Sequence, residues 1–225
     1  EAWGIKPVKN NVQQSFLMDA LLNDNIKLVT TIGKAGTGKT LLALAAGLQK
    51  TINRKEYSRI IVSRAVIPVS RDIGFLPGPK EEKLTPWMGA IFDNLEFLSQ
   101  DFSANKRDTK STSAERVKSL MMAGPIELEA LAYIRGRSIS EQWIIIDEGQ
   151  NISKEQMKTI ISRAGKNTKI VITGDIEQID NYRLDSSNNG LVHVINSFKG
   201  CEIYSHITLT KTERSALSEL AGLLL

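Results

Sequence analysis

A glycine-rich stretch that ends in lysine and threonine is the part of this sequence whose residue types and spacing most clearly indicate chemistry. It runs from Gly33 to Thr40 as GKAGTGKT and fits the pattern G-x-x-x-x-G-K-[ST]. An apolar run typical of a strand, Ile26–Ile32, precedes it, and the helical pattern LLALAAGLQ follows it. Backbone N–H groups in such a turn point at phosphate oxygens, beside the positive end of the next helix. The stretch therefore predicts a nucleotide phosphate site.

Two side chains of this stretch have specific expected roles. Lys39 would reach the β- and γ-phosphates of a nucleoside triphosphate, and Thr40 would offer its hydroxyl to Mg²⁺. A chance glycine-rich turn is the alternative, which the flanking strand and helix patterns disfavour. The residues expected to bind the nucleotide here are Gly33, Lys34, Ala35, Gly36, Thr37, Gly38, Lys39, Thr40 and Leu41.

A pair of carboxylates ends a second apolar run, Trp143–Asp147, which Glu148 follows at once. Because consecutive strand residues face opposite ways, the two carboxylates are expected to have different roles unless the strand has already ended. We assign Asp147 to Mg²⁺ through water. Glu148 is then the general base for the attacking water, which would indicate hydrolysis rather than transfer to a bound substrate. An acidic strand end that only begins a turn is the alternative.

Amide side chains follow the ends of two strands. Gln150 would either sense the γ-phosphate or simply begin the next helix, for which Ser153 and Gln156 predict a capping box. Gln178 follows the apolar run Lys169–Thr173, at the edge of the sheet where doubly wound folds bind ligands. It would orient the attacking water or report the γ-phosphate. A solvated glutamine in an ordinary turn is the alternative.

Arginine is the third requirement, because charge that builds up on the γ-phosphate is commonly met by a guanidinium. The candidates are Arg163 and Arg214. Arg163 ends a helical pattern that Gly165 would cap, so it could simply complement the helix dipole. Arg214 is expected in the first turn of a helix, where the dipole disfavours a cation, and a functional role is favoured there.

Basic residues interleaved with aromatic ones suggest a groove for single-stranded nucleic acid. The candidates for phosphate contact are Arg64, Arg135 and Arg137. Arg135 and Arg137 flank a glycine and would either follow a phosphate backbone or grip a neighbouring subunit. Trp87 shares helical spacing with Ile91 and is favoured as a core residue over a stacking platform.

Length and composition limit the class of protein. The 225 residues suit one domain with an insertion, and 41% hydrophobic with 24% charged residues excludes a disordered or collagen-like chain. No apolar run approaches the roughly 20 residues of a membrane helix, so no membrane contact is expected. The single cysteine fits a cytoplasmic location. The net charge of +4 permits nucleic-acid binding. Since no initiator Met is present, we expect a piece of a longer protein.

Short apolar runs alternate with helical patterns along the chain, which is typical of βαβ units. The expected strands are Ile26–Ile32, Arg59–Ser63, Trp143–Asp147, Lys169–Thr173 and Ile203–Leu209. Their continuously apolar centres favour an α/β fold with a mostly parallel sheet covered by helices on both faces. Residues 66–142 are interpreted as a Pro/Gly-rich and helical insertion after the second strand, with helices from about Pro86 to Leu98 and from about Ser113 to Gly124. The chain, 1–225, is expected to form a single domain.

The motifs, taken in order, resemble the ATPase domain of PhoH-like proteins, a branch of the P-loop NTPases similar to RecA and superfamily 1 helicases. The resemblance rests on GKAGTGKT, DIGFLPG, YIRGRS, IIIDEGQN, VITGDIEQID and the closing ERS. It implies Mg²⁺-dependent ATP hydrolysis coupled to binding and unwinding or remodelling of RNA, in ring-shaped homo-oligomers such as hexamers in which an arginine reaches a neighbour's nucleotide. The opening Trp3-Gly4-Ile5 most resembles the form that follows an N-terminal PIN nuclease domain, which this chain lacks.

The resemblance also implies a role for Gln14, which corresponds to the glutamine that reads adenine in helicase-like ATPases. A surface-helix residue is the alternative. The sequence departs from the family pattern at Ala65, Ser70 and Gly149, where Pro, Gly and Ala are expected. None of these changes removes a reacting group; they concern the shape of the insertion and the stiffness behind Glu148.

Two other functions stay open. A P-loop kinase would need a pocket for a phosphoryl acceptor, and Glu148 and Gln178 argue against it. A regulatory module would use ATP to assemble a ring and gate an attached nuclease, without separating strands.

Overall fold

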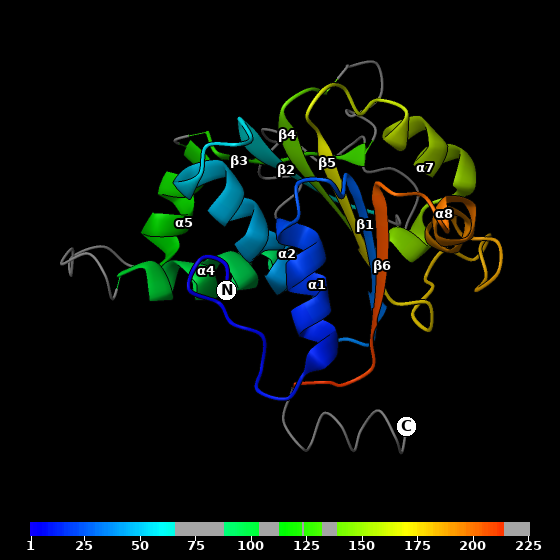
Figure 1. Ribbon diagram of the computed structural model, residues 1–225, viewed down its shortest axis with the longest axis horizontal. Coiled ribbons are helices and arrows are strands. Elements are labelled where there is room, and N and C mark those ends of the chain that lie inside the picture. The colour runs from blue at the N-terminus through cyan, green and yellow to red at the C-terminus, as the bar shows by residue number, and fades with distance from the viewer. Residues whose placement is uncertain (66–87, 104–112, 123, 132–138, 214–225) are drawn as a thin grey trace.

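The computed structural model describes residues 1–65, 88–103, 113–122, 124–131 and 139–213 (Figure 1). Its centre is a six-stranded sheet in the order β3-β2-β4-β5-β1-β6, in which every pair is parallel. The strands are β1 Leu28–Gly33, β2 Arg59–Arg64, β3 Ile126–Leu128, β4 Gln142–Asp147, β5 Lys169–Gly174 and β6 Tyr204–Leu209. Because all strands run in the same direction, their carboxyl ends share one edge of the sheet. The predicted P-loop NTPase type of α/β fold is confirmed.

Helices cover both faces of this sheet (Figure 1). One face carries α1 Val12–Leu22, α2 Lys39–Leu48, α4 Gly89–Ser103 and α5 Ser113–Met122, and the other carries α7 Lys154–Ile161 and α8 Gly190–Phe198. The short helical segments η1 Gln49–Asn53 and η4 Gly149–Asn151 follow α2 and β4. None of the helices in the described ranges is both long and apolar enough to cross a bilayer.

Strand residues alternate between two hydrophobic cores, one on each face of the sheet. Ile145 of β4 and Val171 of β5 pack on the side of α1, α2 and α4. Their neighbours Ile144 and Ile170 pack on the side of α7 and α8. Because every second residue enters each core and both cores are apolar, these strands read as uninterrupted apolar runs in the sequence.

The predicted helix over residues 86–98 corresponds to α4, which is described from Gly89. Three of its residues at helical spacing are at most 1% exposed, namely Ile91, Leu95 and Leu98. The fourth residue expected on that stripe, Trp87, lies outside the described residues. The spacing of apolar residues was therefore a sufficient guide to which side of this helix packs on the core.

The strand β3 and the helix α1 are among the elements that were not predicted. The strand β3 lies within the segment 66–142 and pairs with β2, with Ile126 beside Ile60. Its three residues, Ile-Glu-Leu, are too short to show an alternation. The helix α1 has apolar residues on several sides, including Val12 and Phe16, which are 59% and 64% exposed, so it shows no clear apolar stripe.

A lysine side chain is buried at the amino-terminal edge of the sheet. Lys169, the first residue of β5, is 0% exposed. It donates hydrogen bonds to three carbonyl oxygens at the end of α1, those of Ala20 (2.9 Å), Leu21 (2.5 Å) and Asn23 (2.9 Å). Burial, reinforced by the ammonium of Lys50, lowers the pKa of Lys169 to about 7. This side chain joins the end of α1 to the start of β5.

Candidate functional site

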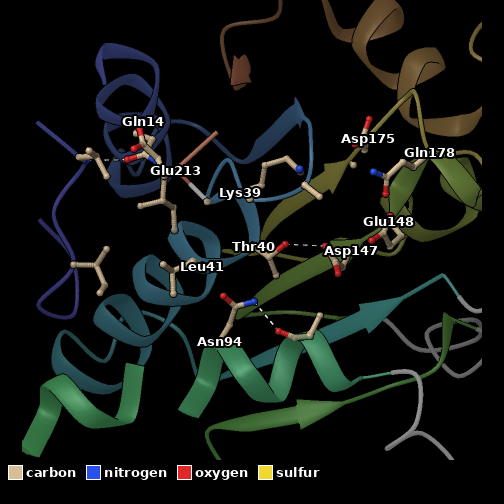
Figure 2. Close-up of a pocket in the computed structure, with 18 of the residues that line it drawn as sticks. Gln14, Lys39, Thr40, Leu41, Asn94, Asp147, Glu148, Asp175, Gln178 and Glu213 are labelled. Carbon is tan, nitrogen blue, oxygen red and sulfur yellow. Dashed lines mark hydrogen bonds between the residues drawn. The ribbon is translucent and has the colours of Figure 1, made fainter. Parts of the chain in front are cut away.

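A cavity of about 420 Å³ opens at the carboxyl-terminal edge of the sheet (Figure 2). Its walls come from the loop between β1 and α2, from the ends of β2, β4 and β5, and from α1 and α4. The predicted site residues that line it are Gln14, Ala35, Gly36, Gly38, Lys39, Thr40, Leu41, Arg64, Asp147, Glu148 and Gln178. The structure thus brings the predicted phosphate loop, the carboxylate pair and Gln178 to one place.

The glycine-rich loop has the backbone form that its sequence predicts. Gly38, the N-cap of α2, has φ +88°, a left-handed conformation that residues with a Cβ rarely adopt, and a Cβ here would also lie 3.1 Å from Gln14 Nε2. The helix α2 then starts at Lys39, whose Nζ donates to the carbonyl oxygens of Gly33 and Lys34. The buried Thr37 donates its hydroxyl to Lys34 O at 2.9 Å and closes the loop. The first N–H groups of a helix have no intrahelical partner, so this loop can receive phosphate oxygens.

A hydroxyl and a carboxylate meet beside the loop. Thr40 Oγ1 donates to Asp147 Oδ1 at 2.9 Å, and Thr173 Oγ1 donates to the same oxygen at 2.5 Å. No group of three or more potential metal ligands from His, Cys, Asp and Glu exists in the described ranges. Mg²⁺ does not require such a group, because it commonly binds through one or two protein oxygens, several waters and substrate phosphates. Thr40 and Asp147 fit that mode of binding.

Glu148 stands outside the strand that carries Asp147. Its backbone is left-handed, with φ 57° and ψ 41°, so the alternation of the strand ends at Asp147 and both carboxylates face the cavity. Both oxygens of Glu148 are held: Oε1 accepts from Arg64 Nη2 at 2.9 Å, and Oε2 accepts from Gln150 Nε2 at 2.6 Å. The carboxylate is therefore fixed at the wall of the cavity, as a group that positions a water must be.

The residue behind Glu148 is a glycine for a reason of packing. A Cβ at Gly149 would lie 2.6 Å from Ile172 Cγ2 and 3.3 Å from Thr173 O. Ile172 is fully buried in the core beneath α8. Glycine therefore stands where the family pattern has alanine, because β5 approaches too closely here to leave room for a Cβ.

Gln150 connects the ends of β4 and β5. It is fully buried; besides Glu148, its Nε2 donates to Gln178 O at 2.9 Å, and its Oε1 accepts from the backbone N–H of Asp175 at 3.0 Å. The helix α7 begins only at Lys154, and its predicted capping box between Ser153 and Gln156 is present. Gln150 thus fixes the position of the general-base candidate relative to the segment that carries Gln178.

The opposite end of the cavity is formed by α1 and by the segment after β6. Gln14 is only 4% exposed, which is not expected of an ordinary surface-helix residue. Its Oε1 accepts from Val8 N at 2.8 Å, and its Nε2 donates to Thr37 O at 3.0 Å. An amide group carries two donors and two acceptor positions, so one of each stays available at the cavity wall.

The predicted arginines differ in where they lie. Arg64 lines the cavity and contacts Glu148, with its Nε also 3.9 Å from Asp147 Oδ2. Arg163 is not brought to this cavity: it follows α7 at the amino-terminal edge of the sheet, where its carbonyl oxygen accepts from Ile139 N at 3.0 Å. The cause is that α7 runs antiparallel to the strands. Within its own chain Arg163 therefore does not line this cavity; Arg214, Arg135 and Arg137 lie outside the described residues.

Several cavity residues had no role assigned from the sequence. Glu213 of the closing ERS lines the cavity, and Asn11 Nδ2 donates to Glu213 Oε1 at 2.8 Å. Ala90 and Asn94 of α4 form another part of the wall. Asn11 and Glu213 are 202 residues apart, so no local sequence pattern predicts their contact. The motif ERS marks Glu213 but does not indicate what its side chain does.

The chain matches the family model described as "PhoH-like protein" over residues 5–221. It is 53% identical to "Protein PhoH2" of Bacillus subtilis (strain 168) over 99% of this chain and 48% of that protein. It is 34% identical to "Protein PhoH2" of Mycolicibacterium smegmatis over 98% of this chain and 47% of that protein. The chain thus spans about half the length of these relatives.

Two solved structures resemble this chain at lower sequence identity. The Pif1 helicase from Candida albicans has a TM-score of 0.42 and 16% identity, over 92% of this chain and 41% of that chain. The Sulfolobus solfataricus SWI2/SNF2 ATPase core in complex with dsDNA has a TM-score of 0.42 and 17% identity, over 92% of this chain and 46% of that chain. The family model matches nearly the whole sequence, and this match alone shows that the protein belongs to the PhoH-like family.

Proposed function

We propose that this chain is an ATPase whose Mg²⁺-dependent hydrolysis of ATP is coupled to binding and unwinding or remodelling of single-stranded RNA. The observation that carries the ATPase proposal is that one cavity combines a phosphate loop, the Thr40–Asp147 pair and the fixed carboxylate of Glu148. These are the parts that a P-loop nucleotide hydrolase needs: phosphate binding, metal binding and a group that receives the proton of water.

Each residue has a defined task in the proposed reaction. The loop N–H groups and Lys39 bind the β- and γ-phosphates, and Thr40 and Asp147 hold Mg²⁺, which when bound neutralises charge on the phosphates. Glu148 takes the proton of the attacking water as the water oxygen bonds to the γ-phosphorus and the bond to the leaving ADP oxygen breaks. Gln178 orients that water, and Arg214 supplies positive charge at the γ-phosphate.

Nucleic-acid binding is proposed at the same edge of the sheet. Tyr182, in the loop after β5, is 84% exposed, and the guanidinium carbon of Arg183 lies 5.3 Å from its ring centroid. An exposed aromatic ring beside a cation is suited to stacking a base and pairing with a phosphate. Arg64, Arg135 and Arg137 are proposed as further phosphate contacts.

The hydrogen bonds around Asn151 support coupling between such a contact and hydrolysis. Asn151 Oδ1 accepts from the backbone N–H of Asp180 at 2.9 Å and of Asn181 at 3.3 Å, and Asn181 precedes Tyr182. Asn151 also follows Gln150, which holds Glu148 and Gln178. A displacement of the Tyr182 loop would therefore reach the residues that position water through a short chain of contacts.

We further propose that copies of the chain assemble into a ring such as a hexamer, with Arg214 reaching a neighbour's γ-phosphate, and that a PIN ribonuclease domain is attached in the full-length protein. The support is the sequence resemblance, together with the greater length of the relatives. Mixing Arg214→Ala with an excess of Lys39→Ala should restore some hydrolysis, because the second variant supplies the guanidinium. No rescue in mixtures shown to co-assemble would assign Arg214 to its own chain.

The deciding experiment is steady-state phosphate release with and without single-stranded RNA, single-stranded DNA and duplex, using Lys39→Ala as the background control. The proposal expects basal release that single-stranded RNA stimulates, together with separation of a labelled duplex. Release and RNA binding without strand separation would favour the regulatory module. Little release until a small acceptor is added would favour a kinase.

A further inference from the structure

The residues at the two ends of the cavity determine how a nucleotide would lie in it. Lys39, Thr40 and Asp147 fix the end that receives the β- and γ-phosphates. The nucleoside must then extend the other way, toward Gln14 and Leu41. Figure 2 shows Gln14 and Glu213 close together on this far side, away from Asp147 and Glu148.

Glu213 is held in this region from two directions. Its backbone N–H donates to Gly36 O, in the middle of the phosphate loop, at 3.0 Å. Its Oε1 accepts from Asn11 Nδ2 at 2.8 Å, and the side chain is 23% exposed. Just before it, Thr210 donates from both its backbone N–H and its hydroxyl to Gln13 Oε1, at 2.9 and 3.0 Å. The segment after β6 is thus tied both to α1 and to the loop.

A carboxylate here selects a particular part of a nucleotide. An ionised carboxylate only accepts hydrogen bonds, and it repels phosphate, so its partner must be a donor on the nucleoside. Among the residues the structure describes, Glu213 Oε2 has no hydrogen-bond partner. Gln14 already presents a donor and an acceptor suited to the edge of the base. The sugar lies between base and phosphates, and Glu213 contacts both the cap of the helix that carries Gln14, through Asn11, and the loop, through its own backbone N–H.

We propose that Glu213 accepts a hydrogen bond from a ribose hydroxyl and makes this site prefer ribonucleotides to deoxyribonucleotides. The proposal rests on the proposed function, since it takes ATP as the ligand, and adds to it a residue that reads the sugar. A hydrogen bond to a charged group in a partly enclosed site is worth on the order of a 10-fold change in affinity or more.

Asn11 is the positioning residue for both ends of the nucleoside. It is 4% exposed and caps α1, with its Oδ1 accepting from Gln14 N at 3.0 Å while its Nδ2 holds Glu213. One buried amide therefore sets the start of the helix that carries the base reader and the orientation of the sugar reader. Aspartate at this position would keep the cap, because it accepts as well as asparagine, but could not donate to Glu213.

The test measures dissociation constants by calorimetry for ATP, 2′-deoxyATP and 3′-deoxyATP. Wild type should bind ATP about 10-fold more tightly than the analogue that lacks the recognised hydroxyl. Glu213→Ala should lose about that factor for ATP and nothing for that analogue, so their ratio falls to about one. Asn11→Asp should reduce the same ratio, because the new side chain cannot donate to Glu213 and repels its carboxylate. Glu202→Ala, which removes an exposed carboxylate that does not line the cavity, should leave the ratio unaltered.

Several results would overturn the inference. If Glu213→Ala weakens ATP and both analogues equally, the residue has a structural role only. If a parallel titration with an ATP analogue that lacks the 6-amino group shows that Glu213→Ala changes only the preference for ATP over that analogue, the residue reads the base. If wild type binds ATP and both deoxy analogues equally, the ribose reading is wrong while the proposed function stands. If wild type binds no nucleoside triphosphate, the proposed function itself is wrong, and the inference with it.

Discussion

The buried ammonium of Lys169 predicts how the stability of the fold depends on pH. Burial lowers its pKa from 10.5 to about 7. Above about pH 7 the unfolded chain therefore binds more protons than the folded chain, and the free energy of unfolding rises with pH until the unfolded pKa is passed. With a slope of up to about 1.4 kcal/mol per pH unit, the rise between about pH 7 and pH 9 comes to about 2 kcal/mol.

The assay is urea unfolding of wild type and Lys169→Met at both pH values. Methionine fills a similar volume without a titrating group, so the variant should lose the rise while the remaining groups still contribute equally to both chains. The three carbonyls bonded to Lys169 favour its charged form and so oppose the lowering of its pKa. An unfolding free energy in wild type that does not rise between about pH 7 and pH 9 would refute the prediction. Should the variant not fold, an NMR titration of Lys169 Nζ in wild type decides the matter: a midpoint above about pH 9 contradicts the prediction.

Three further predictions concern the site. Lys39→Ala should abolish phosphate release, because the phosphates lose the loop's ammonium; turnover at the wild-type rate would contradict the phosphate-loop assignment. Glu148→Gln should still bind ATP and Mg²⁺ but hydrolyse ATP at least about 100-fold more slowly, since the amide keeps the shape and cannot take a proton. Failure to bind nucleotide would instead make Glu148 a ligand. Gly149→Ala should lower the unfolding free energy in urea by about 1–2 kcal/mol, because the clash with Ile172 Cγ2 at 2.6 Å outweighs the smaller entropic gain of removing glycine; equal or greater stability would show that β5 yields easily.

The parts of the site that could be predicted all follow from local sequence. Lys39 and Thr40 begin a helix after the loop that follows one strand, and Asp147 ends another strand, with Glu148 next to it. In a parallel sheet the order of strands is not needed to know that these ends meet at one edge. This is why the sequence was enough to expect that these residues line one cavity, as they do.

The nucleoside end could not be predicted in the same way. Asn11 and Glu213 are separated by 202 residues and meet only because β6 pairs beside β1, next to α1. Arg64 was interpreted as a nucleic-acid contact because it is one of several basic residues interleaved with aromatic ones, and the structure shows that its guanidinium also lies beside Glu148. Charge and position in a strand do not reveal which oppositely charged side chain the adjacent strand presents.

The left-handed backbone of Glu148 has a consequence for how loss of activity would arise. A residue with a Cβ pays about 1 kcal/mol or more for this conformation, whereas asparagine adopts it more readily. A chain with asparagine at 148 would lack the carboxylate and its contacts with Arg64 and Gln150, but the relief of backbone strain would offset part of that loss, so the chain would still fold. Chaperones and proteases act on unfolded chains, so cellular quality control would leave such a chain untouched. Inactive copies would therefore accumulate at normal levels beside active ones, and only an assay of hydrolysis would distinguish them.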